Sequence, residues 1–122
     1  QILNLGSNHF SSSLPVGIGR LRVGKLKELH LGRNSFNGSV PTEIGHLAHM
    51  RVLSVRECSL SGSLPSELGR LRDFSLLVGK HNSFSGILPS HVLSLASLKV
   101  VELGFNDLHG QLPSEVGLSG DL

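Results

Sequence analysis

Histidines are the residues of this sequence with the most evident capacity for chemistry, and there are seven of them. His46 and His49 are three positions apart, a spacing that places two side chains on one face of a helix. A zinc site needs three or four protein ligands, and the same stretch supplies no third one. The sequence also lacks the motifs G-x-S-x-G and H-E-x-x-H and the P-loop. We therefore expect exposed histidines, no metal or cofactor, and no enzyme activity in this segment.

Two other side chains could undergo chemistry. Cys58 is the only cysteine, so an internal disulfide framework is excluded. Cysteine is small, tolerates burial and is a weak donor, so we expect a structural role for Cys58, with a reactive thiol as the alternative. Asn37-Gly38-Ser39 matches the acceptor sequence for N-glycosylation. Such short sequences often arise by chance, so Asn37 is a candidate glycosylation site that supports a secreted setting only weakly.

The overall charge does not indicate a nucleic-acid or membrane partner. The formal net charge is only +2, and no apolar run approaches the roughly 18 residues of a membrane span. Arg20, Arg22, Lys25 and Lys27 form a basic run, but it has no interleaved aromatic residues and Glu28 adjoins it. A solvated loop is the expected state of such a run.

The elements that would position these residues follow from an internal repeat. The segment FNGSVPTEIGHL, from Phe36 to Leu47, is followed at intervals of 24 residues by LSGSLPSELGRL, FSGILPSHVLSL and LHGQLPSEVGLS. Repetition at a fixed period of this length is the signature of a solenoid. One anchor position marks each repeat, and its residues are Asn8, Asn34, Cys58, Asn82 and Asn106.

Aligned on the anchors, the repeats read L-x-x-L-x-L-x-x-[N/C]-x-[L/F]-x-G-x-[L/V]-P-x-x-[I/L/V]-G-x-L. This pattern resembles the leucine-rich repeats, and within them the 24-residue plant-type subclass, over essentially the whole chain. The resemblance implies an α/β solenoid, a right-handed superhelix with a parallel β-sheet on its concave face and short 3₁₀ or turn segments on its convex face. It also implies that residues 1–122 form a single array.

Elementary physical chemistry supports the same fold. The alternation at Leu29-His30-Leu31 predicts a short strand, and stacked repeats would pair such strands about 4.8 Å apart in a parallel sheet. Buried anchor asparagines carry both donors and acceptors and can bridge successive coils as a ladder. We expect five repeats with the bounds 1–25 (partial), 26–49, 50–73, 74–97 and 98–122. We also expect this array to be a piece of a longer solenoid.

Two departures from the regular pattern affect the expected core and return path. The first two anchors are 26 residues apart, so two extra residues lie within residues 20–26, where we expect a bulge on the return path. Gly79 stands where other repeats place an inward Leu or Val. A glycine there weakens the strand by roughly 0.5–1 kcal/mol. We expect a local dent, or a shift in which Leu76 or Val78 compensates.

The outward face of the predicted sheet is the candidate binding surface, because solenoids bind partners on such extended concave faces. Neighbouring strands are expected to bring Arg51, Arg56, Lys80 and His81 into one basic patch. An exposed aromatic residue beside arginine is typical of an interaction hot spot. The complete set of candidate partner-binding residues is Arg51, Arg56, Glu57, Lys80, His81, Glu102 and Phe105.

The resemblance implies a non-catalytic module that binds a protein or peptide, sometimes with a co-receptor. It places the chain in the extracellular ectodomain of a receptor-like kinase or receptor-like protein. A structural subunit of a larger assembly, inside the cell or outside it, is the alternative. A polygalacturonase inhibitor or an ice-binding protein is a further one. Ice binding would require a regular row of Thr, Ser or Asn on the strand face, which is instead charged, and the inhibitor would need cysteine-paired caps.

Overall fold

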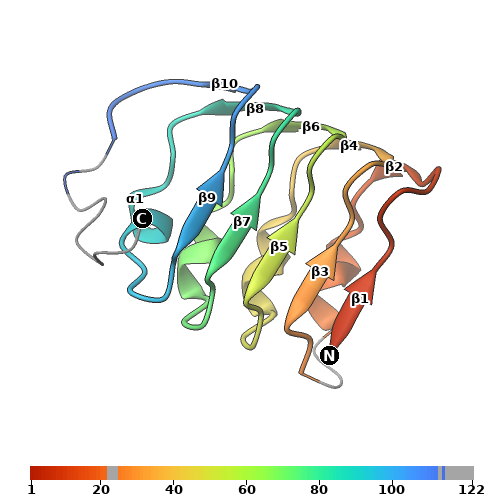
Figure 1. Ribbon diagram of the computed structural model, residues 1–122, viewed down its shortest axis with the longest axis horizontal. Coiled ribbons are helices and arrows are strands. Elements are labelled where there is room, and N and C mark those ends of the chain that lie inside the picture. Colours follow the sequence, from red (N-terminus) through yellow and green to blue (C-terminus); the bar gives the residue numbers. More distant parts are fainter. Residues whose placement is uncertain (22–24, 113, 115–122) are drawn as a thin grey trace.

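Successive coils of the chain lie side by side along one axis (Figure 1). The computed structural model describes residues 1–21, 25–112 and 114. Within them each coil contains a strand of a first sheet, a strand of a second sheet and, in the first four coils, a short helical segment. This is the α/β solenoid that the repeat predicts.

The first sheet is parallel throughout and has the strand order β1-β3-β5-β7-β9. Leu29, Leu53 and Leu77 pair in register as the middle residues of three strands, and each is at most 1% exposed. Because neighbouring side chains alternate between faces, the two flanking residues of each strand point outward. The strands are β1 (Ile2–Asn4), β3 (Glu28–His30), β5 (Val52–Ser54), β7 (Leu76–Val78) and β9 (Val100–Glu102).

A second parallel sheet, which the sequence analysis did not anticipate, follows the anchors and has the order β10-β8-β6-β4-β2. It buries Phe36, Leu60 and Phe84. In the last four coils the residue four positions after the anchor is a glycine with a positive φ, between 69° and 93°, which explains the glycine of the repeat because other residues rarely adopt that region. In the first coil Ser12 occupies this position with a φ of 68°. The strands are β2 (Ser11–Ser13), β4 (Ser35–Gly38), β6 (Ser59–Gly62), β8 (Ser83–Gly86) and β10 (Asp107–Leu108).

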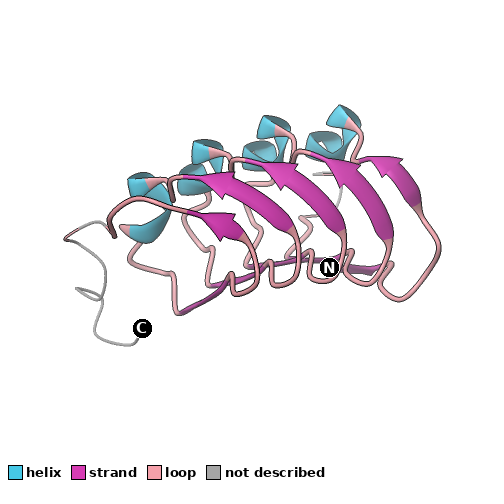
Figure 2. Ribbon diagram, turned by 90° about the horizontal axis from the view of Figure 1, so that it is seen from above, coloured by secondary structure: helices cyan, strands magenta, loops and turns pink. Residues whose placement is uncertain are grey.

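Short helical segments form the side of the solenoid opposite the first sheet, with the second sheet between them (Figure 2). Each begins directly after a proline of the repeat, whose extended backbone and missing N–H suit the start of a helix. The prediction of short helical segments after the prolines is confirmed. They are the 3₁₀ helices η1 (Val16–Arg20), η2 (Thr42–His46) and η3 (Ser66–Arg70) and the α-helical turn α1 (Ser90–Leu93).

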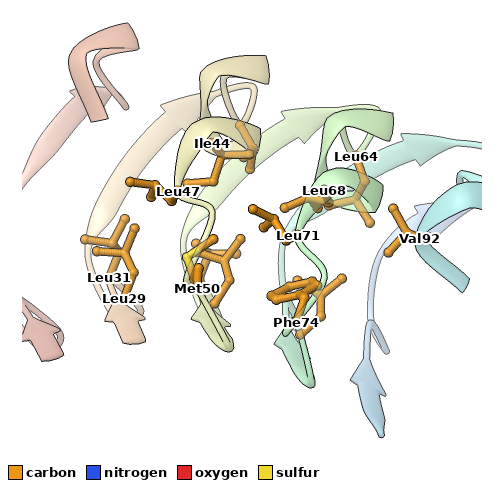
Figure 3. Close-up of a cluster of buried hydrophobic side chains, with 14 of the residues drawn as sticks. Leu29, Leu31, Ile44, Leu47, Met50, Leu64, Leu68, Leu71, Phe74 and Val92 are labelled. Carbon is orange, nitrogen blue, oxygen red and sulfur yellow. The ribbon is translucent and has the colours of Figure 1, made fainter. Parts of the chain in front are cut away.

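The core runs the length of the solenoid between the two sheets and the helical segments (Figure 3). The second, third and fourth coils contribute large apolar side chains from all three sides, and burial of each contributes roughly 1.5–3 kcal/mol. The largest side chains with less than 2% exposure are Phe74, Phe84, Leu29, Ile44, Leu47, Met50, Leu53, Leu60, Leu68, Leu71, Leu77 and Leu98.

The missing side chain of Gly79 is compensated by residues other than the expected ones. A Cβ atom built on Gly79 would lie 2.8 Å from Leu103 Cδ2 and 3.1 Å from Phe84 Cε2. These two side chains therefore occupy the space that an inward leucine fills elsewhere. The expectation that Leu76 or Val78 would compensate is wrong, because both keep their outward positions in β7 and are half-buried.

Two expectations fall partly on residues that the structure does not describe. The bulge expected at residues 20–26 contains residues 22–24, and at its edge Lys25 has a φ of 58°. The end of the repeat assigned to residues 98–122 lies outside the described residues from residue 115 onward.

Gly45 provides a test of how tightly the helical segments stack. A Cβ atom at Gly45 would lie 2.7 Å from the carbonyl oxygen of Glu67 in the next coil. Gly45→Ala is therefore expected to push η2 away from η3 and to lower the free energy of unfolding by about 1–3 kcal/mol. Urea denaturation followed by far-ultraviolet circular dichroism measures this loss, since the chain has no Trp or Tyr to report by fluorescence.

Gly17→Ala in η1 is the matched control, because a Cβ atom there has no neighbour within 4 Å among the atoms of the structure. The control variant should be at least as stable as the wild type, since alanine reduces the conformational freedom of the unfolded chain. Equal stability of the two alanine variants would contradict the close approach at Gly45.

Candidate functional site

The anchor asparagines fix the turn that follows each strand of the first sheet. The Asn82 Nδ2 group donates to the carbonyl oxygens of Val55 at 2.9 Å and Gly79 at 3.2 Å, and Oδ1 accepts from the Leu60 N–H at 3.0 Å. Asn34 and Asn106 bond in the same way to their own coil and the preceding one. Asn8 is exposed and donates to Leu5 and Gly6 of its own coil. The carboxamides thus tie neighbouring coils together beneath the candidate site.

Cys58 occupies the anchor position of the third coil with a sulfur in place of a carboxamide. Its Sγ atom lies 3.7 Å from the carbonyl oxygen of Leu31 and 3.6 Å from that of Arg56, both within reach of a weak S–H donor. Burial raises the pKa of the Cys58 thiol above its usual value. A thiol with a raised pKa forms less of the reactive thiolate at neutral pH, which favours the structural role.

Cys58 cannot accept the backbone N–H that an anchor asparagine accepts. Leu60 and Phe84 donate to the asparagine Oδ1 of the following coil at 3.0 and 2.9 Å, and Phe36 is the equivalent donor facing Cys58. Cys58→Asn is therefore expected to raise the free energy of unfolding by about 1 kcal/mol. Urea denaturation checks the gain, and Cys58→Ser, which has no carbonyl group to reach Phe36, should not reproduce it. An asparagine variant no more stable than the serine variant would contradict the prediction.

The residue before each anchor has a left-handed backbone, which sequence reasoning missed. The φ angles of Ser7, Arg33, Glu57, His81 and Phe105 lie between 54° and 59°. Outside glycine and asparagine this conformation costs roughly 1–2 kcal/mol. Backbone hydrogen bonds hold it: in the first four coils the N–H of this residue donates to a carbonyl oxygen of the next coil at 2.8–3.1 Å. The side chains of this column are therefore presented in one fixed direction.

Six of the predicted partner-binding residues gather at the carboxyl ends of the strands, beyond or at the arrowheads in Figure 1, and we call them the strand-end surface. Arg51 does not belong to it, because it precedes β5 whereas Arg56 follows β5. At about 3.3 Å per residue the two lie roughly 16 Å apart along the strand direction. The single basic patch that includes Arg51 is therefore wrong. The strand-end surface consists of Arg56, Glu57, Lys80, His81, Glu102 and Phe105.

Carboxylates neutralise much of the positive charge on this surface. Lys80 Nζ lies 3.1 Å from Glu102 Oε2, and Arg33 Nε lies 3.1 Å from Glu57 Oε2. Both pairs are half-exposed, so each contributes only about 0–1 kcal/mol to stability. Arg56 differs, because its Nε atom is 4.0 Å from Glu57 Oε1 and its side chain has no hydrogen bond to a described residue. Arg56 is thus the cation of this surface best placed to accept an anionic partner.

Phe105 and His81 form the aromatic part of the strand-end surface. Their ring centroids are 4.3 Å apart and the rings are nearly parallel, at 8°. Phe105 is nevertheless 75% exposed, the largest value among the exposed large hydrophobic residues described. The stack holds an apolar ring in water in a defined orientation.

A polar hollow of about 200 Å³ lies beside Arg56, over the first three strands of the first sheet. Gly6 and Gly32 occupy the column in which later coils have Arg56 and Lys80, so the absence of side chains in two coils opens the space. The lining residues are Asn4, Gly6, Ser7, His30, Gly32, Arg33, Ser54 and Arg56.

An outward row of apolar side chains was also missed from the sequence. Val52, Leu76 and Val100 pair in register on β5, β7 and β9, and all three point away from the core. Val100 is 42% exposed, and the other two are half-buried. We call these three residues the apolar row. The sequence signal was present as Val52-Leu53, Leu76-Leu77 and Val100-Val101, pairs in which only the second residue belongs to the core.

The remaining candidate residues lie away from the first sheet. Asn37 is exposed on β4 of the second sheet, and Ser39 beside it is exposed as well. His46 and His49 are exposed at and after the end of η2. Among the described residues no three His, Cys, Asp or Glu side chains are grouped as a metal site requires. The described helices are also all too short or too polar to cross a membrane.

Comparison with known proteins identifies one family and a set of similar structures. The family model of the Leucine Rich Repeat matches residues 1–21, 25–47 and 49–71. Curated protein sequences gave no significant match.

The solved structures similar to this chain include plant receptor kinases. One is the leucine-rich-repeat ectodomain of the Arabidopsis thaliana membrane receptor kinase GASSHO1/SCHENGEN3 in complex with CASPARIAN STRIP INTEGRITY FACTOR 2, with 36% identity over 98% of this chain and a TM-score of 0.92. A second is the Arabidopsis receptor kinase HAESA with the peptide hormone IDA and the co-receptor SERK1, with 34% identity over 99% of the chain and a TM-score of 0.92. A third is the BIR3–SERK2 complex from Arabidopsis thaliana, with 30% identity over 95% of the chain and a TM-score of 0.87. This chain spans 14%, 20% and 61% of the three matched chains, respectively.

Proposed function

This chain belongs to the leucine-rich repeat family, and on that premise we propose that it is a non-catalytic module that binds a peptide or protein through its first sheet. The observation that carries the proposal is the exposed Phe105 ring, stacked on His81 on the same strand-end surface as the cationic Arg56. Aromatic and arginine side chains dominate the binding energy of many interfaces. A ring that is already held in place loses little conformational entropy when a partner covers it.

The similar structures support a receptor setting for this module. They include the leucine-rich-repeat ectodomain of one plant membrane receptor kinase, and a second plant receptor kinase in complex with a peptide hormone and a co-receptor. We propose that the chain is likewise part of an extracellular receptor ectodomain, with a peptide or protein as ligand and a second receptor chain as a further partner. The strand-end surface is the proposed contact, and Arg51 lies at the opposite edge of the same sheet.

Selection of short random peptides displayed on phage tests this function directly. The native 122-residue chain is expected to enrich a limited set of related sequences, whereas the heat-unfolded chain used as a control should not. Phe105→Ala should weaken binding of the enriched peptides at least tenfold, as is typical of a hot-spot residue, which costs about 2 kcal/mol or more. The proposal is wrong if the folded chain enriches no sequence beyond the unfolded control.

Asn37 provides a test of the extracellular setting. Its side chain is exposed, and the sequon Asn37-Gly38-Ser39 lies on the second sheet, where a glycan would leave the first sheet uncovered. Secreted expression in plant cells is expected to yield a protein whose mass decreases on enzymatic removal of N-glycans. Asn37→Gln should lack that part of the mass, and Asn8→Gln, which is exposed but lies outside a sequon, should retain it. Masses of wild type and Asn37→Gln that differ only by the added methylene group would contradict glycosylation at this site.

A further inference from the structure

We propose that the ligand of the first sheet is an extended peptide that carries an apolar side chain and an acidic side chain about four residues apart. The apolar side chain covers the apolar row, and the carboxylate enters the polar hollow beside Arg56. This inference rests on the proposed function and specifies the chemistry of the ligand.

The apolar row is the proposed contact of the apolar side chain of the ligand. Val52, Leu76 and Val100 are direct neighbours across three paired strands, so they form one strip roughly 10 Å long at about 4.8 Å per strand. Val78, two residues after Leu76 on the same face, extends the strip along β7. A peptide side chain such as leucine or phenylalanine laid on this strip would remove apolar surface of both partners from water. No polar group of the strip would be buried, since valine and leucine side chains have none.

The polar hollow is the proposed contact of the acidic side chain of the ligand. It is lined by Arg56, whose guanidinium has no hydrogen bond to a described residue, and by Ser7 and Ser54, whose side chains carry hydroxyl groups. The amide of Asn4 adds a donor, because its Oδ1 atom accepts from the Gly6 N–H at 3.0 Å while its Nδ2 group has no hydrogen bond to a described residue. Arg33 is held by Glu57, so its charge is offset while that of Arg56 is only weakly opposed at 4.0 Å. A carboxylate matches this set of donors because it accepts hydrogen bonds with both oxygens.

The distance between the two features sets the spacing within the ligand. Arg56 follows Val52 by four residues on the same coil, and Leu76 is one strand further along the sheet. Four residues at about 3.3 Å and one strand step of about 4.8 Å give a separation of roughly 14 Å. An extended peptide covers that separation in about four residues. This separation is a straight-line distance between Arg56 and Leu76, so it is the same for either direction of the peptide chain.

The enriched phage-displayed peptides provide the test. Their carboxyl ends are fused to the coat protein, so a carboxylate can come only from a side chain. We expect the enriched sequences to share an aspartate or glutamate and a large apolar residue about four positions apart. Arg56→Gln should weaken their binding about ten- to a hundredfold, as expected for a hydrogen-bonded charge. Arg70→Gln, an exposed arginine at the end of η3, should leave it unchanged.

The apolar half has its own matched pair of variants. Val100→Thr keeps the shape of the side chain and replaces one methyl by a hydroxyl, which should weaken binding about fourfold. Val16→Thr makes the same change at a 66% exposed position on η1 and should have no effect. Replacing the acidic residue of the peptide by its amide should make Arg56→Gln and wild type bind alike, because the two changes remove the same contact.

The outcomes separate this inference from the function on which it rests. Enriched peptides that lack the acidic and apolar pair, or that bind Arg56→Gln and Val100→Thr as tightly as wild type, overturn the inference and leave the binding function intact. Peptides that are not enriched at all overturn both. Circular dichroism of each variant confirms that a loss of binding is measured on folded protein.

Discussion

Phe74→Ala is expected to lower the free energy of unfolding by about 3–5 kcal/mol. Phe74 is fully buried between β7 and η3 and is among the largest side chains of the core (Figure 3). Its removal leaves a cavity that the neighbouring coils can close only in part, because both are held in register by two sheets. Domains are typically stable by only 5–15 kcal/mol, so this loss is a large part of the total.

Phe105→Ala is the matched control for this prediction, since it makes the same chemical change at a 75% exposed position. Its stability should remain within about 0.5 kcal/mol of wild type. Urea denaturation monitored by circular dichroism measures both variants, and the denaturant slope should be compared too, because coils can unfold separately in repeat proteins. Similar stability losses in the two variants would contradict the core position of Phe74.

Asn82→Ala is expected to lower the free energy of unfolding by about 3 kcal/mol, nearly as much as Phe74→Ala. The change leaves the Leu60 N–H and the carbonyl oxygens of Val55 and Gly79 without their shared partner. Each buried group that loses its hydrogen bond costs about 1–3 kcal/mol, and relaxation of the backbone recovers part of the sum. Two coils are affected at once, because the carboxamide joins the second sheet of one coil to the turn of the next.

Asn8→Ala tests whether this cost comes from the bonds between coils. Asn8 occupies the same position in the repeat, but it is exposed and donates only to its own coil. Its replacement should cost less than about 1 kcal/mol, because water can satisfy the carbonyl groups that it leaves. If both alanine variants lose the same free energy, the bridging role of Asn82 is wrong. Asn82→Asp adds a further comparison, since it keeps the acceptor for Leu60 and removes the donor.

The fold was predictable because each coil repeats the same physical requirements. Columns of leucine, the proline before each helical segment and the glycine with positive φ each have one structural reason, and five copies of the pattern reinforce each other. The second sheet was harder to predict from the sequence, because segments such as Ser59–Gly62 contain serine and glycine, which have little strand propensity. Pairing with the neighbouring coils, which a single coil cannot show, makes them strands.

The candidate site was predictable only in outline. Sequence reasoning placed the charged columns on the outward face, but the partners of Lys80 and Glu57 depend on side chains of neighbouring coils. The left-handed backbone of Arg33 and His81 has no signal in these residue types, because backbone hydrogen bonds to the next coil hold it. The apolar row was missed for another reason. A pair such as Leu76-Leu77 reads as continuous core, although only one of its two side chains points inward.

The direction of the hydrogen bonds between coils has a mechanical consequence. In both sheets the bonds between strands run along the solenoid axis, since each strand pairs with the strands of the coils before and after it. A force applied along this axis is therefore in line with the bonds and opens one interface at a time, as in a zipper. Each detached coil of 24 residues can extend to about 80 Å. Under axial tension the molecule is therefore expected to lengthen one coil at a time.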